Sequence, residues 1–358
     1  MNANEVIANR ALDLLGAQRG DYTRLGPNDH VNLGQSTNDA YPTAVKVALH
    51  GAAADLNRAM ALLAETLTER ARAFTDVVKL GRTQLQDAVP MTLGQEFGTF
   101  ALGVADDTAI LTRAADALCE VNLGGTAIGT GLNAHPRFSE SCTRHLARIT
   151  GMPVHPARDL IEATQGVGAF VEVSGALRRI ALRLIKVCND LRLLASGPQA
   201  GLAEIRLPEL QAGSSIMPGK VNPVIPEAVT QVCFDVVGAD AAVALAAQAG
   251  QLQLNAFEPL MAHALLTSLA RLSAACRLLA RRCVSGIRAD EERALAHVRG
   301  SAVLATALNP LIGYGPSTEL ARRSVTERRS VRELAGESRV LPGELLDELL
   351  DPRRLAGH

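Results

Sequence analysis

Apolar residues recur at alternating steps of three and four positions through residues 170–194. The stripe comprises Phe170, Val173, Leu177, Ile180, Leu184, Val187, Leu191 and Leu194. This period predicts a helix that packs at a shallow angle against its neighbours in a bundle. At 1.5 Å per residue, such a helix is about 37 Å long. Further apolar residues widen the stripe, which predicts neighbours on more than one side.

Four other segments carry a comparable helical pattern and are bounded by proline or glycine: residues 42–74, 91–121, 224–250 and 258–284. No segment shows a convincing alternating pattern, so five long helices predict an all-α, elongated bundle over residues 34–287. Beyond Gly286 the helical segments shorten and the charge density rises. A small helical C-terminal domain is therefore expected over residues 288–358.

The composition fits closely packed helices, because aromatic residues make up 3% of the chain and tryptophan is absent. A formal net charge of −1 gives no electrostatic case for nucleic acid or an anionic membrane as a partner. The N-terminus has no secretory pattern, and no uninterrupted apolar run approaches membrane-spanning length. Six widely spaced cysteines without a CxxC pair predict buried free thiols. A soluble, cytoplasmic protein is expected.

Residues 213–223 carry the most informative polar run, Gly-Ser-Ser-Ile-Met-Pro-Gly-Lys-Val-Asn-Pro. Two glycines and two prolines predict an exposed loop that leads into a helix. Ser214, Ser215, Lys220 and Asn222 are donors able to converge on a carboxylate or on charge that develops during a reaction. An isolated Gly-Ser-Ser would more often be an ordinary surface loop.

Two further polar loops stand out against the apolar framework. Residues 34–43 place Ser36, Thr37 and Asn38 just before a helix, where they can bind an anion or simply cap the helix. Residues 81–90, Gly-Arg-Thr-Gln-Leu-Gln-Asp-Ala-Val-Pro, would by themselves be a polar turn.

The three loops together, in this order and at similar separations, resemble the aspartase/fumarase superfamily. The resemblance continues through residues 121–130 and 252–255 and covers essentially the whole chain. Within the superfamily, Leu160-Ile-Glu-Ala-Thr164 and the Glu258-Pro259 pair look like aspartate ammonia-lyases, whereas Asn133-Ala-His-Pro136 looks more like fumarate hydratases. The balance identifies the chain as a member of the aspartate ammonia-lyases.

The resemblance implies β-elimination of ammonia from L-aspartate to give fumarate, without a cofactor or a metal, in a homotetramer whose subunits share active sites. Ser214 would be the general base, assisted by Lys220. The implied binding residues are Ser36, Thr37 and Ser215 for the β-carboxylate, Thr83, Lys220 and Asn222 for the α-carboxylate, and Asn38 and Gln84 for the leaving amine. Serine serves as a base only where its alkoxide is stabilised.

Two further side chains near these loops have expected roles. Gln84 stands where many relatives have histidine, and since glutamine cannot exchange protons, a binding role is expected for it. Glu227 is expected either to orient one wall of the site or to cap the helix that follows the loop.

The chain departs from the family at its start. Relatives carry an N-terminal domain before this sequence, and their Thr-Asn-Met-Asn motif overlaps the chain only at Met1-Asn2. Residues 1–33 are therefore expected to be a remnant of that domain. Two alternatives remain beside an aspartate ammonia-lyase: a class II fumarate hydratase, and a catalytically silent, truncated subunit that associates with a full-length homologue.

Overall fold

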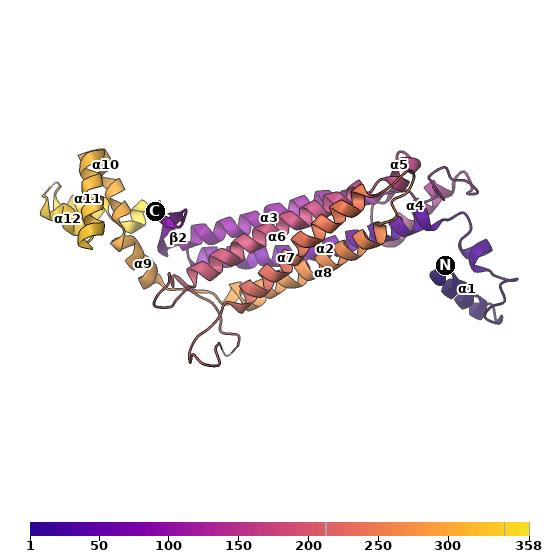
Figure 1. Ribbon diagram of the computed structural model, residues 1–358, viewed down its shortest axis with the longest axis horizontal. Helices are drawn as coiled ribbons and strands as arrows, with labels where there is room; N and C mark the ends of the chain where they lie inside the picture. Colours follow the sequence, from indigo (N-terminus) through magenta and orange to yellow (C-terminus); the bar gives the residue numbers. More distant parts are fainter. Residues whose placement is uncertain (212, 340, 358) are drawn as a thin grey trace. The chain divides into compact units, whose positions relative to one another are not determined.

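Five long helices dominate the chain in the computed structural model, which describes residues 1–211, 213–339 and 341–357 (Figure 1). They are α2 (Thr37–Ala73), α3 (Leu93–Asp116), α6 (Gly168–Leu194), α7 (Val224–Gln248) and α8 (Glu258–Arg282). Each matches one of the predicted helical segments, and the all-α prediction is confirmed. The segment predicted over 91–121 is longer than α3, because a strand ends at Thr92 and a 3-10 turn follows Asp116.

The chain divides into two compact units. The first unit comprises residues 1–57, 109–179 and 234–272, and the second comprises residues 58–108, 180–233 and 273–358. Each of the five long helices contributes residues to both units. The predicted boundaries near residues 34 and 288 follow the chain order, whereas the units collect segments that are far apart in the sequence.

In the first unit, polar contacts join neighbouring long helices. The Ser174 hydroxyl of α6 donates to the Asp240 carboxylate of α7 at 2.6 Å, and Asn57 of α2 donates to the Thr112 hydroxyl of α3 at 3.0 Å. The shorter elements of this unit are α1 (Asn2–Leu14), the π-helical turn η1 (Pro27–Val31), α4 (Phe138–Thr150), α5 (Leu160–Gln165), and the parallel strand pair β3 (Glu120–Val121) and β4 (His155–Pro156).

In the second unit, Arg183 of α6 forms an ion pair with Asp107 of α3. Two antiparallel strand pairs also lie in this unit: the hairpin β1 (Val78–Thr83) and β2 (Gln86–Thr92), and the short pair β5 (Ile205–Arg206) and β6 (Arg288–Ala289). The hairpin was expected only as a polar turn.

The C-terminal helices bury a hydrophobic core of their own together with Val78 and Leu80 of β1. These elements are α9 (Glu291–Gly300), η4 (Ala302–Leu308), α10 (Asn309–Ile312), α11 (Tyr314–Glu327), α12 (Val331–Glu337), α13 (Gly343–Leu349) and α14 (Pro352–Leu355). Val298, Leu308 and Leu334 lie at the centre of this core and are fully buried. The hairpin is thus anchored to the C-terminal helices by its apolar side chains.

All six cysteines are free, as expected: Cys119, Cys188, Cys233, Cys276 and Cys283 are buried, and Cys142 is partly buried. Burial raises the pKa of Cys233, Cys276 and Cys283 to about 12 and raises the pKa of Cys188 further. These thiols therefore remain protonated at neutral pH.

Helix α7 corrects one expectation, because its length and composition would allow it to cross a membrane. One stripe of the helix, with Val229, Val236 and Val243, is buried, whereas Phe234 and Leu245 are exposed. A helix of this composition is also found at the centre of soluble helical proteins.

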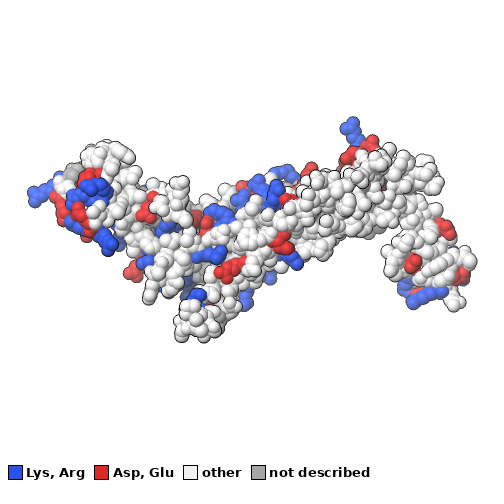
Figure 2. All heavy atoms as spheres, viewed as in Figure 1, with Lys and Arg blue, Asp and Glu red and all other residues white. Residues whose placement is uncertain are grey.

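Charged side chains of both signs lie interspersed on the face drawn in Figure 2. Many form short-range pairs on the C-terminal helices, such as Arg322 with Glu319 and Arg323 with Glu327. This mixture offers no single-sign patch on that face.

Candidate active site

Ser36 is the last residue before α2, which begins at Thr37. The backbone N–H of Asn38 donates to the Ser36 hydroxyl at 3.2 Å, and the backbone N–H of Ser36 donates to Asp39 Oδ1 at 2.9 Å. These reciprocal contacts have the form of a capping box. Ser36 therefore caps the helix, and its hydroxyl proton stays available to a ligand because the oxygen acts as the acceptor.

Asp39 links this loop to the loop at 121–130. Its carboxylate is fully buried, and Oδ2 accepts the backbone N–H groups of Gly124 at 3.0 Å and Thr126 at 2.9 Å. With the Ser36 contact, three backbone donors compensate a buried negative charge. Sequence reasoning missed Asp39, although a carboxylate in the first turn of a helix is a recognisable signal.

Asn38 is held by the same pair of loops. Its side-chain amide donates to the Ala127 carbonyl at 2.8 Å, and the Asn122 amide donates to the Asn38 carbonyl at 2.9 Å. Within the described ranges, the side-chain oxygen of Asn38 makes no hydrogen bond. It is an acceptor suited to an ammonium group.

Thr83 and Gln84 lie at the tip of the β1–β2 hairpin. Thr83 pairs with Gln86, so Gln84 and Leu85 form a two-residue turn with φ values of +54° and +62°. Both residues have the left-handed backbone conformation of a type I′ turn. Neither is glycine, so each adopts this conformation at a cost in free energy. Thr83 and Gln84 are exposed. The turn presents both side chains to solvent.

The signature loop, residues 213–223, is irregular and leads directly into α7, as predicted. The half-buried Ser214 hydroxyl accepts the backbone N–H groups of Ile216 at 3.2 Å and Met217 at 3.1 Å. Two backbone donors aimed at one hydroxyl oxygen would favour negative charge on that oxygen. Ser215 and Lys220 are exposed. The Lys220 ammonium makes no ion pair within the part of the chain that the structure describes.

Glu227 has a partner that sequence reasoning did not anticipate. It lies in the first turn of α7, and its carboxylate is 3.8 Å from the Arg192 guanidinium of α6. An acidic side chain there also interacts favourably with the helix N-terminus. Asn222, just before the helix, is half-buried.

The structure thus joins the predicted residues only in part. Asn38 is hydrogen-bonded to the 121–130 loop, and Ser36 is linked to the same loop through Asp39. Thr37 is exposed in the first turn of α2. No hydrogen bond between described residues connects the hairpin tip with the signature loop. Each of these two segments belongs to the second unit and is positioned by its own element.

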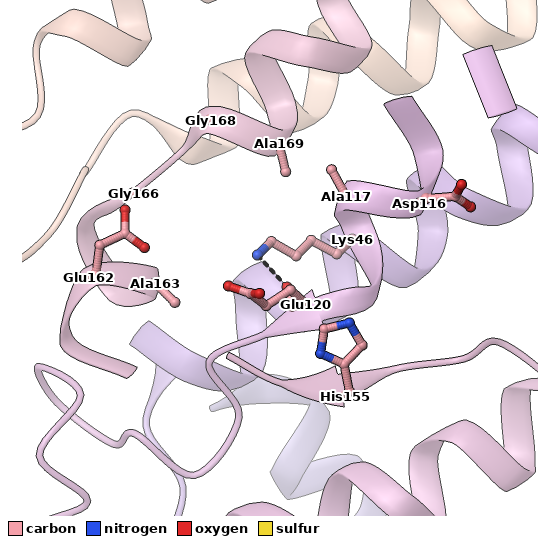
Figure 3. A pocket seen from close by; sticks show the side chains of 10 residues that line it. All are labelled: Lys46, Asp116, Ala117, Glu120, His155, Glu162, Ala163, Gly166, Gly168 and Ala169. Carbon is pink, nitrogen blue, oxygen red and sulfur yellow. Dashed lines mark hydrogen bonds between the residues drawn. The ribbon is translucent and has the colours of Figure 1, made fainter. Parts of the chain in front are cut away.

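A pocket of about 300 Å³ lies in the first unit, and sequence reasoning missed it (Figure 3). Lys46, Asp116, Glu120, His155 and Glu162 line it, together with small residues of α5 and α6. The Lys46 ammonium points between the carboxylates of Glu120 and Glu162 and donates to the Glu120 carbonyl oxygen at 2.7 Å. None of the predicted site residues lines this pocket.

A buried lysine and a buried glutamate of the first unit have shifted pKa values. Burial lowers the pKa of Lys46, against the opposing effect of Glu120, Glu258 and Glu162. Burial raises the pKa of Glu258 to about 7, against the attraction of Lys46. In the sequence, the signal for this buried cation was a lysine set in the apolar stretch Val45-Lys46-Val47.

Across the described residues, no three His, Cys, Asp or Glu side chains are placed to hold a metal ion.

Comparisons with known proteins agree over 99% of the chain. Residues 1–238 match the family described as Lyase, and residues 304–357 match the family described as Fumarase C C-terminus. Aspartate ammonia-lyase from Helicobacter pylori is 52% identical over 99% of this chain and 76% of its own length. Aspartate ammonia-lyase from Escherichia coli is 50% identical, with 99% of this chain and 74% of that protein covered.

Solved structures of similar proteins have the same fold. A fumarate lyase:delta crystallin from Brucella melitensis, bound to cobalt, superposes with a TM-score of 0.97 at 52% identity, over 99% of this chain and 77% of that one. A class II fumarase from Schistosoma mansoni superposes with a TM-score of 0.93 at 36% identity, over 99% and 78% of the two chains.

Proposed function

The chain belongs to the aspartate ammonia-lyase family, and we propose that it catalyses the reversible β-elimination of ammonia from L-aspartate to give fumarate. The observation that carries the proposal is the Ser214 hydroxyl with its two backbone donors, Ile216 and Met217. Removing a proton next to the β-carboxylate creates an aci-carboxylate with extra negative charge, so both the base and that carboxylate need preorganised donors.

In this mechanism Ser214 is the general base. Its alkoxide is stabilised by the two loop N–H groups, and the exposed ammonium of Lys220 approaches when substrate binds. The carboxylate-binding groups are those implied by the resemblance: Ser36, Thr37 and Ser215 for the β-carboxylate, and Thr83, Lys220 and Asn222 for the α-carboxylate. The capping geometry of Ser36 supports this role, because it leaves the hydroxyl proton free to donate.

The leaving amine faces Asn38 and Gln84. The free side-chain oxygen of Asn38 accepts a hydrogen bond from the substrate ammonium, and Gln84 adds a second amide. Neither side chain exchanges protons, and none is needed: when the C–N bond breaks, its electron pair goes to the nitrogen and the ammonium group leaves as neutral ammonia. Glu227, at the start of α7, supports the loop by pairing with Arg192 of α6.

We also propose a cytoplasmic homotetramer with active sites shared between subunits. Six exposed residues of α7 lie at steps of three and four along one stripe: Ala228, Gln231, Phe234, Gly238, Ala241 and Leu245. A largely apolar stripe on a long helix is suited to packing against the same helix of another subunit.

The activity is tested by following fumarate absorbance with L-aspartate as substrate and malate formation with fumarate as substrate. We expect deamination to exceed hydration. Ser214→Ala should lower kcat by at least ~10²-fold and leave KM within a few-fold of its original value, because it removes a proton-transfer group. Ser285→Ala, at an exposed serine of the same unit, is the matched control.

Three outcomes would redirect the proposal. Malate formation in excess of deamination would make the protein a class II fumarate hydratase. A chain that is inactive alone but binds tightly to a full-length homologue would be a silent subunit. A Ser214→Ala variant with normal kcat would move the base elsewhere.

A further inference from the structure

Glu204 is a fully buried carboxylate in the segment between α6 and the signature loop. Its Oε1 accepts from the Arg82 guanidinium at 2.7 Å and lies 2.9 Å from His297 Nδ1. Its Oε2 lies 3.7 Å from the Lys79 ammonium. Three cationic or donor groups from two distant segments therefore surround one carboxylate.

Lys79 and Arg82 both belong to β1, the strand that ends at Thr83. Lys79 is itself buried, and its ammonium is 3.1 Å from the Glu96 carboxylate of α3. The positive charges of Lys79 and Arg82 thus balance the negative charges of Glu96 and Glu204. Burial alone would raise the pKa of Glu204, but Arg82, Lys79 and His297 outweigh burial and lower it. Glu204 therefore stays ionised at neutral pH.

The backbone of Glu204 is fixed as firmly as its side chain. Its N–H donates to the Leu194 carbonyl at the end of α6, and its carbonyl accepts from the Asp290 N–H, both at 2.9 Å. The next residues, Ile205 and Arg206, form β5 and pair with β6. Ten residues further along the chain is Ser214.

We propose that Glu204 is a positioning residue that fixes the hairpin tip, with Thr83 and Gln84, to the segment that leads into Ser214. The tip needs such support because its turn holds two non-glycine residues in left-handed conformations, and strain of this kind persists only where the surroundings hold it. For catalysis, the inference rests on the proposed function. The structural coupling itself does not.

Amide hydrogen exchange on the full chain tests the coupling without reference to activity. Glu204→Gln keeps the shape of the side chain and removes its charge, so Arg82 and Lys79 both lose a charged partner and only Lys79 keeps Glu96. We expect the amides of residues 78–92 to exchange at least ~10-fold faster, with α11 unchanged, because local opening then needs less free energy. Glu209→Gln, an exposed glutamate in the same segment, is the matched control and should leave the hairpin unchanged.

Arg82→Lys is the second variant, for the case in which Glu204→Gln does not fold. Lysine keeps the charge opposite Glu204 but loses the guanidinium, which also donates to the Leu80 carbonyl at 3.2 Å. We expect faster exchange in the same residues, by a smaller factor. Unchanged hairpin exchange in every variant that folds would overturn the proposal, whatever happens to the activity.

Steady-state kinetics test the catalytic consequence. If Thr83 holds the α-carboxylate, a loosened tip should raise KM for L-aspartate about 10-fold in Glu204→Gln and lower kcat by less, because binding suffers more than proton removal. A faster-exchanging hairpin with unchanged KM would show that Glu204 only stabilises the fold and would overturn its positioning role. If the unmodified chain forms no fumarate at all, the proposed function fails, while the exchange result still decides the coupling.

Discussion

At the residue scale, Glu258 is the group whose environment most clearly predicts a pH effect. Its pKa is raised from 4.5 to about 7 by burial. Between these values the unfolded chain loses its proton while the folded chain keeps it. The stability that Glu258 contributes is therefore complete below pH 4.5 and falls as the pH rises toward 7. Above pH 7 it is lost, and the free energy of unfolding is then lower by up to about 3 kcal/mol.

Glu258→Gln removes this titration. We expect the difference in unfolding free energy between the variant and the unmodified chain to change between pH 4.5 and 7 and to stay constant outside that window. Denaturant unfolding at a series of pH values measures it. Glu172→Gln, an exposed glutamate on α6, should give a curve parallel to that of the unmodified chain. A parallel curve for Glu258→Gln as well would contradict the raised pKa.

Individual residues also show what a single sequence can and cannot predict. The Gly-Ser-Ser-Ile-Met-Pro run predicted the loop that precedes α7, because its glycines and prolines act locally. Asp39 and Glu204 were not identified, because their partners are remote: Gly124 is 85 residues from Asp39, and Arg82 is 122 residues from Glu204. A polar residue whose partners are that distant has no local signature.

At the scale of elements, the β1–β2 hairpin is the principal difference between prediction and structure. The long helices repeat their apolar pattern over many turns, so their period is unambiguous. The hairpin strands are short, and their turn, Gln84-Leu85, lacks the asparagine or glycine that normally marks a type I′ turn. Tertiary contacts anchor the hairpin instead, because Val78 and Leu80 of β1 pack in the C-terminal core.

The strain in this turn can be measured by substitution. Leu85 is 71% exposed and left-handed, so Leu85→Gly relieves the backbone without losing buried contacts. We expect the unfolding free energy to rise by about 0.5–1 kcal/mol, since the relief exceeds the entropy that glycine adds to the unfolded chain. The midpoint of denaturant unfolding provides the measurement.

Val89→Gly is the control for the turn. Val89 is also exposed on the hairpin, but it lies in strand β2 with an ordinary backbone. Glycine there should lower the unfolding free energy by about 1 kcal/mol. Equal destabilisation by both substitutions would mean that the turn stores no strain.

At the scale of the whole molecule, the exposed stripe of α7 makes self-association the main question. Phe234 lies within the stripe and is 59% exposed. Phe234→Glu places a charge on a surface that would be buried between subunits, so we expect it to lower the molar mass measured by light scattering at micromolar concentration. Because active sites are proposed to be shared, fumarate formation should fall with it.

Val325→Glu provides the comparison, because Val325 is 70% exposed on α11, away from the stripe. It should leave the mass unchanged. An unmodified chain that is already a folded monomer, or a Phe234→Glu variant that keeps its full mass, would remove the proposed assembly.

The buried cysteines give the chain an intrinsic reporter of its own opening. Cys188, Cys233 and Cys276 lie on three different long helices, and Cys283 lies just beyond the last of them. Only the thiolate reacts with alkylating reagents, and burial keeps these groups as thiols out of reach of solvent. Each labelling event at these positions therefore records a separation of packed helices. The labelling rate of each cysteine measures how often its helix separates from its neighbours, without an engineered probe.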